Sequence, residues 1–231
     1  MGFDVTYHPV TPGSIRQTYL EPRALILNGM VDEVASMAAE LGIRPFLTEG
    51  YIRLLDSSTG FGANDVFDKS HGFAAAACQG YFGTYFYIRG GAFSFVMARH
   101  PEYKDYTMPW SEVLPEIYTA EVWNEVRENY CSGAYIPCGK AAELAEIIRT
   151  DNSVREHFSE FMPGGNLDVF LKALDHACSN GTDLLEASDV ILPNPADPYS
   201  SSGYTDLGNC DPEGMSLYID SAADGLAGNW E

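Results

Sequence analysis

The sequence predicts an α+β fold, a single and mostly helical domain over residues 1–231 with a small β-sheet. Apolar residues recur at helical spacing in several stretches, whereas stretches with strand character are few and short. Hydrophobic residues make up 45% and charged residues 20% of the chain, which are ordinary values for a globular protein. The apolar stretches are spread evenly and no linker divides them, which favours one domain.

Three segments are predicted to form the sheet. Apolar and polar residues alternate from Phe3 to His8, which predicts a half-buried strand that ends at Pro9. The apolar segments 134–137 and 184–192 are the other two predicted strands. A sheet of this size is too small to hold the whole core, so helices must cover it.

The remaining periodic segments predict helices. Their expected positions are 31–41, 45–55, 74–78, 111–130, 140–149, a helix opened by a Ser153–Glu156 capping box, 166–181, and a last helix from Asp211-Pro212. The helix from Asn166 is the most regular of these, and Gly181 is expected to end it. Residues 57–65 and the segment that follows Pro193 are predicted to be loops.

The stretch 81–95 mixes aromatic residues with glycines. Propensity alone allows a strand there, but we expect tightly packed helices whose glycines let the backbones approach each other. Arg89 lies between Tyr87 and Phe93, and a guanidinium among aromatic rings can hold an anion or stack on a ring. Arg89 and Tyr7 are therefore the candidate ligand-binding residues. The alternative for Arg89 is a structural ion pair with one of the many acids.

Charge is the most unusual global feature. The chain has 33 Asp and Glu against 13 Lys and Arg, a formal net charge of -20. No Lys or Arg follows Lys172, and most of the acids beyond it are expected to be solvated: Asp175, Asp183, Glu186, Asp189, Asp197, Asp206, Asp211, Glu213, Asp220, Asp224 and Glu231. Such a surface repels phosphate backbones and attracts basic proteins, so a basic protein is the expected partner and nucleic acid is not. The alternative is that the charge only maintains solubility.

Several motifs with well-understood chemistry are missing. The sequence has no P-loop, no dinucleotide-binding glycine motif, no His-Glu-x-x-His and no Gly-x-Ser-x-Gly. No cofactor is therefore expected. The chain also has no stretch of eighteen apolar residues and no apolar leader, so neither a membrane span nor a secretory signal is predicted, and a cytoplasmic location is expected.

His8, His71 and Cys78 are the candidate catalytic residues. Both histidines stand at the ends of predicted elements, where functional side chains often occur. With a carboxylate such as Asp4 or Asp211 they would form a metal site or an active site. Cys78 follows His71 by about 10.5 Å along a helix, too far for the thiol to reach that imidazole. A buried, unreactive thiol is the alternative.

One stretch near the C-terminus has the spacing of a calcium loop. Asn209, Asp211 and Glu213 alternate as oxygen ligands, a glycine follows, and Asp220 stands at the twelfth position. The usual first Asp and last Glu are replaced, however, and Pro212 favours the start of a helix capped by Asp211. The helix cap is the competing interpretation.

Three stretches carry a resemblance to a known family. They are Met1–Pro9, Gln79–Phe95, and Leu184–Pro195 together with Asn209–Gly214. These stretches resemble an uncharacterised bacterial family of hypothetical proteins whose chains start in a similar Asp-Val-x-Tyr-His-Pro way. The resemblance would cover nearly the whole chain and implies a bacterial cytoplasmic protein. It implies no activity, and no catalytic residues can be carried over.

Three functional hypotheses follow. The first is a non-enzymatic acidic binding or regulatory protein, of the immunity type that neutralises a basic toxin. The second is an enzyme that binds a metal or small ligand through His8, His71 and nearby carboxylates. The third is a structural or assembly protein, which a large self-complementary apolar patch would favour.

All five cysteines, namely Cys78, Cys131, Cys138, Cys178 and Cys210, are expected to be free thiols. Their number is odd, their spacing is irregular and no secretory signal is predicted, so reduced thiols are the default. Alkylation of the unfolded chain under non-reducing conditions, followed by mass measurement, should modify every cysteine. A protected pair would show that the protein matures in an oxidising compartment.

Overall fold

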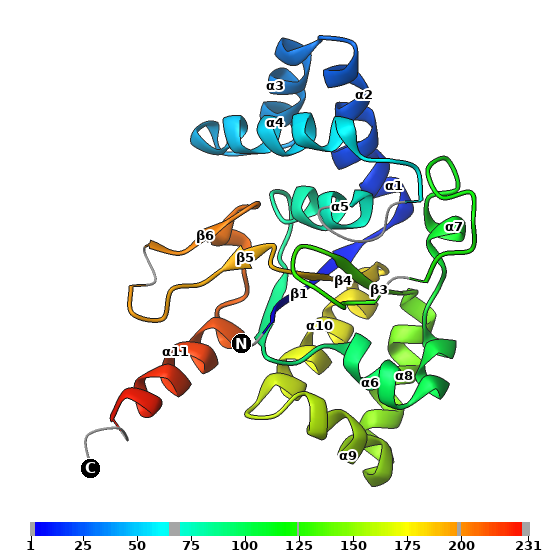
Figure 1. The fold of residues 1–231 in the computed structure, drawn as a ribbon, viewed down its shortest axis with the longest axis vertical. Coiled ribbons are helices and arrows are strands. Elements are labelled where there is room, and N and C mark those ends of the chain that lie inside the picture. Colours follow the sequence, from blue (N-terminus) through cyan, green and yellow to red (C-terminus); the bar gives the residue numbers. More distant parts are fainter. Residues whose placement is uncertain (1–2, 65–69, 124, 198–199, 228–231) are drawn as a thin grey trace.

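A four-stranded antiparallel sheet separates two layers of helices (Figure 1). The computed structural model describes residues 3–64, 70–123, 125–197 and 200–227. The strands are β1 (Asp4–Val10), β2 (Phe86–Arg89), β3 (Ser132–Ile136) and β4 (Asp183–Ser188), in the order β2-β1-β4-β3. A short hairpin of β5 (Ile191–Leu192) and β6 (Ser202–Gly203) lies apart from the sheet. The predicted α+β fold class is confirmed.

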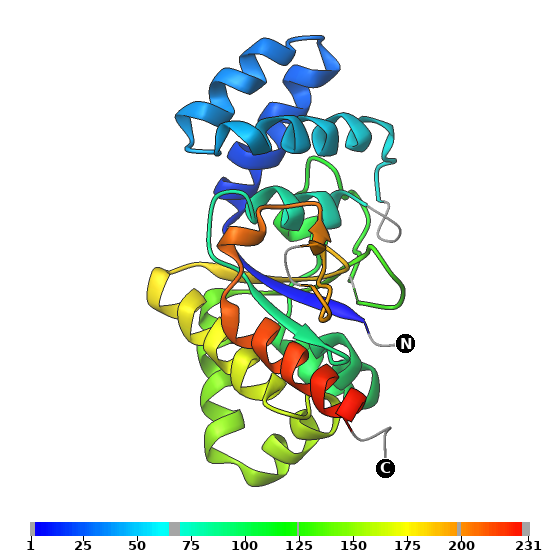
Figure 2. The same cartoon turned by 90° about the vertical axis from the view of Figure 1, so that its left-hand side faces the viewer.

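The layer on one face of the sheet, called here the N-terminal layer, contains α1 (Pro12–Ile15), α2 (Glu21–Leu27), α3 (Val31–Glu40), α4 (Thr48–Ser57), α5 (His71–Gln79) and α7 (Trp110–Val113). The opposite layer, called the C-terminal layer, contains α6 (Phe93–Arg99), α8 (Cys138–Thr150), α9 (Asn152–Phe161) and α10 (Asn166–Asn180). Helix α11 (Pro212–Ala227) lies along the edge strand β2 (Figure 2). Gly214 makes this close approach possible, because a Cβ there would overlap the carbonyl of Tyr87.

Most of the helices predicted from periodicity are confirmed, within a few residues at their ends. Gly181 ends α10 in the left-handed conformation, as expected. Two start signals differ from the prediction. Asp151 caps α9 by accepting from the amides of Ser153 and Val154, and Gly165 precedes Asn166 at the start of α10. For these two helices, apolar periodicity thus predicted the helix correctly, whereas the residue predicted to cap its N-terminus was wrong.

The prediction that the first strand is half-buried was wrong. Val5 and Tyr7 face the C-terminal layer. Asp4, Thr6 and His8 face the N-terminal layer, and each of these residues is at most 5% exposed. The hydroxyl of Thr6 donates to the carbonyl of Ala187, and the other polar residues of β1 also have partners. Alternation in the sequence therefore marked two buried environments, one apolar and one polar, rather than a solvated face.

The expectation of packed helices over 81–95 was also wrong in part. Residues 86–89 form β2, which pairs antiparallel with β1, and a helix, α6, begins only at Phe93. Tyr85 and Tyr87 face one side of the sheet while Phe86 and Ile88 face the other. The strand conformation of 86–89 depends on pairing with residues about eighty positions earlier, so local propensity could not distinguish strand from helix here.

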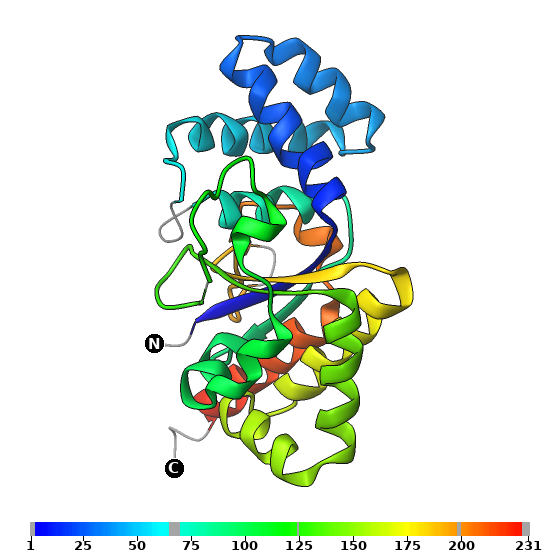
Figure 3. The same cartoon turned by 90° about the vertical axis from the view of Figure 1, so that its right-hand side faces the viewer.

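The long helix predicted at 111–130 was wrong. Helix α7 ends at Val113, and the described residues that follow are irregular apart from turns (Figure 3). Pro115 explains the end, because proline disfavours helical geometry in the residue before it. The side chain of Asn64 accepts from the backbone amides of Thr119 and Ala120, which holds the irregular segment. Residue 124 lies outside the described residues.

The strand predicted at 184–192 is split in two. Asp189 has a φ of 55° and interrupts the extended chain between β4 and β5. A non-glycine residue in this conformation is uncommon, although Asp and Asn tolerate it better than most. The split turns the chain away from the sheet and into the β5–β6 hairpin.

A buried carboxylate joins the sheet to the C-terminal layer. Glu186, on the central strand β4, accepts from the Tyr7 hydroxyl (3.1 Å), the amide of Phe93 (2.6 Å) and the amide of Ala134 (3.2 Å). The amide and hydroxyl of Ser94 donate to it as well. Burial raises the pKa of Glu186 because the charged form loses its hydration, while these donors favour the carboxylate. β1, β3, β4 and α6 thus meet at one side chain.

The substitution Gly133→Ala is expected to lower the free energy of unfolding by about 1–3 kcal/mol, because the added Cβ would overlap Oε2 of Glu186 and displace a carboxylate held by several donors. Chemical denaturation measures the effect. Gly139→Ala is the matched control. No neighbouring atom lies within 4 Å of its added Cβ, and alanine there favours α8 by up to about 1 kcal/mol. Wild-type stability in Gly133→Ala would show that Glu186 is not held in place.

Candidate functional site

His8 lies in the middle of β1 and is fully buried. Its Nε2 is 2.9 Å from Oγ1 of Thr6, and its ring stacks on Tyr85 with 4.9 Å between ring centres. Burial lowers the pKa of His8 to about 3, because the imidazolium would lose its hydration. The ring is therefore neutral at physiological pH.

His71 and Cys78 lie at opposite ends of α5, as helical spacing predicted. Nδ1 of His71 is 2.5 Å from the hydroxyl of Tyr19, and the rings of Phe61 and Tyr118 meet it edge-on. Cys78 is fully buried, and burial raises the pKa of its thiol. A neutral, buried thiol is a poor nucleophile.

The residues with calcium-loop spacing have other partners. Asp211 and Glu213 both bind the ammonium of Lys172, at 2.9 and 2.8 Å. The side-chain Nδ2 of Asn209 donates to the carbonyl of Gly80. Oδ1 of Asp211 accepts from the amide of Glu213 at the start of α11, so the competing prediction of a helix cap is confirmed. Asp220 lies about 10 Å further along that helix than Glu213.

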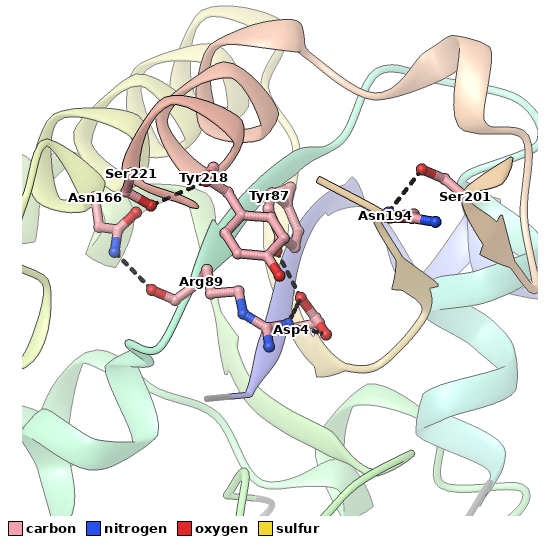
Figure 4. Close-up of polar contacts among 8 residues, drawn as sticks. All are labelled: Asp4, Tyr87, Arg89, Asn166, Asn194, Ser201, Tyr218 and Ser221. Atoms are coloured by element: carbon pink, nitrogen blue, oxygen red, sulfur yellow. Dashed lines mark hydrogen bonds and ion pairs between the residues drawn. The ribbon is translucent and has the colours of Figure 1, made fainter. Parts of the chain in front are cut away.

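Arg89 forms the ion pair that the sequence left as its alternative (Figure 4). Its Nη1 is 2.5 Å from both carboxylate oxygens of Asp4, and the hydroxyl of Tyr87 donates to the same carboxylate at 2.5 Å. The guanidinium also lies 4.5 Å from the ring centre of Tyr218 on α11. The side chain of Asn166 donates to the Arg89 carbonyl. Tyr7, the other ligand-binding candidate, belongs instead to the hydrogen-bond group around Glu186.

Asp189, which follows β4, places a second carboxylate near Asp4. Its amide donates to the carbonyl of Asp4 at 2.6 Å, and only 3% of the residue is exposed. No described residue forms a hydrogen bond with its Oδ2. Burial, and then the negative charge of Asp4, raise the pKa of Asp189. A buried carboxylate in a left-handed conformation costs stability, and no motif in the sequence pointed to it.

Exposed apolar side chains collect at the far end of the N-terminal layer. Among the described residues, the large hydrophobic side chains that are exposed are Leu27 (55%), Met30 (39%), Val31 (43%) and Phe46 (74%). Leu27, Met30 and Val31 belong to the end of α2 and the start of α3, which meet at the top of Figure 1, whereas Phe46 lies beyond the other end of α3. Concentration of such side chains in one part of a surface is typical of an interaction site.

The solvent-facing side of α3 is acidic. Val34 and Ala38 bury the opposite side of the helix. An open hollow of about 480 Å³ lies on the exposed side and is lined by Asp32, Glu33, Ser36, Met37 and Glu40. We call these five residues, together with Leu27, Met30 and Val31, the α3 surface. Phe46 follows α3 in the chain and is not part of the α3 surface.

The carboxylates of the α3 surface have no basic neighbour. Among the residues that the structure describes, no Lys, Arg or His nitrogen lies within 4.0 Å of the carboxylates of Asp32, Glu33 or Glu40. The nearby arginines Arg44 and Arg53 pair with Asp206 and Glu49. The negative charge of α3 is therefore uncompensated within the described structure.

The acids that follow Lys172 form only part of the solvated surface expected from the sequence, and its exposed members are Asp175, Asp197, Glu213 and Asp220. Glu186, Asp189 and Asp206 are buried, and Asp175, Asp211 and Glu213 form ion pairs. Asp183 accepts from the Tyr135 hydroxyl and the amide of Cys138. Glu231 and the side chain of Asp224 lie outside the described residues. The basic and polar partners of the paired acids come from earlier in the chain, so a count of the charges after Lys172 does not include them.

Ligand atoms that could share a metal ion are brought together elsewhere. In the described part of the chain, one group of three or more His, Cys, Asp or Glu has all its ligand atoms within 4.8 Å of one another, and it consists of His100, Glu102 and His157. His157 also lies 2.9 Å through its Nδ1 from the hydroxyl of Tyr103, which is 54 positions earlier in the chain. The His-x-Glu spacing at 100–102 was the available signal, but nothing in the sequence joined it to residue 157.

Comparisons of the chain with protein-family models, curated proteins and solved structures found no match. The resemblance to the family with the Asp-Val-x-Tyr-His-Pro start therefore stays an expectation. Within the described residues, no helix combines the length and the apolar character needed to cross a bilayer.

The substitution Asp189→Asn is expected to stabilise the fold at neutral pH and to have less effect near pH 4. The folded-state pKa of Asp189 is raised, so its ionisation disfavours the folded state as the pH rises through that pKa. Asparagine keeps the shape and tolerates the positive φ. We expect a gain on the order of 1 kcal/mol near pH 7.

Urea denaturation between pH 4 and pH 8 measures this difference. The control Asp220→Asn, at an exposed position of α11, should leave the pH profile parallel to that of the wild type. A pH-independent effect of Asp189→Asn would mean that its charge is not the cause.

Proposed function

We propose that the protein is a non-enzymatic binding protein that engages a basic protein partner through the α3 surface. One observation carries the proposal: exposed apolar side chains and uncompensated carboxylates occur together on and around one helix. A basic toxin bound by an immunity-type protein is a partner of this chemistry.

The composition of the α3 surface fits a protein interface. Leu27, Met30 and Val31 supply apolar area that a partner would remove from water. Asp32, Glu33 and Glu40 supply negative charge that steers and orients a basic partner. Met37 lies within the acidic hollow, and its flexible side chain can adapt to a partner's shape.

Glu40 lies where a carboxylate disfavours its own helix. It is the last residue of α3, and the helix dipole places partial negative charge at that end. A lysine there would stabilise α3, so the glutamate opposes local stability. Residues that do so are often kept for function.

The other two hypotheses have less support. The neutral, buried ring of His8 and the buried thiol of Cys78 do not favour an enzyme built on those residues. Self-assembly through the α3 surface would bring two acidic helix faces together, and like charges would oppose it. The acidic character instead favours a partner of opposite charge.

Neutralising the α3 surface is expected to slow association with the partner. The variant Asp32→Asn/Glu33→Gln/Glu40→Gln removes three charges without changing the apolar contacts. The control Glu146→Gln/Glu156→Gln/Glu160→Gln removes the same charge from exposed positions on α8 and α9. At low salt, we expect the α3 variant to lower the association rate about tenfold and the control to change it much less.

The experiment begins with capture from the native host on immobilised wild-type, α3-variant and control protein. The basic protein lost only from the α3 variant is then purified and its binding kinetics are measured from 0.05 to 1 M salt. Selective loss together with a salt-dependent association rate supports the proposal. If both variants lose the basic protein equally, the binding is an effect of net charge and the proposal is wrong. If all three proteins retain it equally, the α3 surface is not the binding site.

A further inference from the structure

His100, Glu102 and His157 come together from two separate parts of the C-terminal layer. His100 follows α6, Glu102 lies in the 3-10 helix Pro101–Tyr106, and His157 lies on α9. Helices α6 and α9 pack against each other, and the rings of Phe93 and Phe158 stack between them. The group is therefore held by packed elements rather than by a loose loop.

The spacing of the group is close to that of a coordination sphere. Nδ1 of His100 lies 3.6 Å from Oε1 of Glu102, and the two imidazole rings are 3.7 Å apart between centres. Bonds of about 2.0–2.2 Å in tetrahedral geometry place donor atoms about 3.3–3.6 Å apart. The three ligand atoms lie within 4.8 Å of one another, so metal binding requires side-chain rotations that unstack the rings and bring the donors closer.

A neighbouring hydroxyl orients one of the histidines. The hydroxyl of Tyr103 is 2.9 Å from Nδ1 of His157, and Tyr103 is 4% exposed and packs on Phe158. When Nδ1 holds the proton and donates it to this hydroxyl, Nε2 carries the lone pair that binds a metal. Metal-binding histidines commonly have such a partner on the second nitrogen.

The group is open on one side. Glu102 is exposed over 62% of its side chain. Next to it lies a hollow of about 470 Å³, whose lining includes Glu102, His157, Tyr103, Asp105, Lys140 and Glu143. Several of these residues are acidic, which favours a cation.

We infer that His100, Glu102 and His157 bind one divalent transition-metal ion of the zinc class. Three protein ligands leave a coordination position for water or a small anionic ligand, and that position faces the hollow. Two imidazoles and a carboxylate suit zinc better than calcium or magnesium, which prefer oxygen ligands. The site lies across the sheet from the α3 surface and does not depend on the proposed function (Figure 1).

Titration of the metal-free full-length protein with Zn²⁺ in a calorimeter tests the inference. We expect one ion per chain. His157→Gln should lower the affinity at least about tenfold, and so should Glu102→Gln, whose exposed side chain can be changed without disturbing the core. Tyr103→Phe keeps all three ligands but should also weaken binding about tenfold or more, because it removes the orienting hydroxyl. His176→Gln, on α10, is the control and should bind as the wild type does.

Co²⁺ in place of Zn²⁺ identifies the ligands. Visible absorption bands without a thiolate charge-transfer band are expected for nitrogen and oxygen ligands. Cys138 and Cys178 lie close to each other and are an alternative pair of metal ligands. If a thiolate band appears and is lost in Cys138→Ser/Cys178→Ser, the metal binds to these thiols and the inference is overturned. It is also overturned if Zn²⁺ does not bind, or if both His157→Gln and Glu102→Gln bind it as tightly as the wild type.

Discussion

The carboxylate of Glu186 is the interaction on which the C-terminal half of the fold depends. It lies on the central strand, away from water, and backbone amides and hydroxyls from β1, β3 and α6 converge on it. A charged group in such a place is tolerated only when its donors are fixed. The carboxylate therefore specifies how α6 meets the sheet, and α6 in turn carries His100 to α9.

Near the start of β1 and the end of β4, the sheet has a second group of buried carboxylates that is less well paired. Asp4 pairs with the guanidinium of Arg89, whereas the nearby carboxylate of Asp189 forms no ion pair and Asp189 has a positive φ. This strain ends β4 and directs the chain into the β5–β6 hairpin. Three of the acids that follow Lys172, namely Glu186, Asp189 and Asp206, are thus used inside the fold, and the unpaired carboxylates of α3 lie near the other end of the chain.

The two surfaces singled out here lie on different layers with the sheet between them. The α3 surface consists of α3, the turn before it and the end of α2, so residues close together in the sequence supply all of its charged and apolar side chains. The group of His100, Glu102 and His157 depends on the packing of α6 against α9. Changes at one surface should leave the other nearly unaffected, because well-separated sites without shared partners contribute independently.

The sequence by itself determined the fold class, most helices and the approximate positions of β1, β3 and β4, since apolar periodicity and signals such as Gly181 and Asp211-Pro212 act within a few residues. Tertiary structure alone decided that 86–89 is a strand, that the polar face of β1 is buried, and that Arg89 pairs with Asp4. It also decided which acids remain free and which histidine meets Glu102. These outcomes depend on partners tens to nearly two hundred residues away, and no local pattern records the free energy of such contacts.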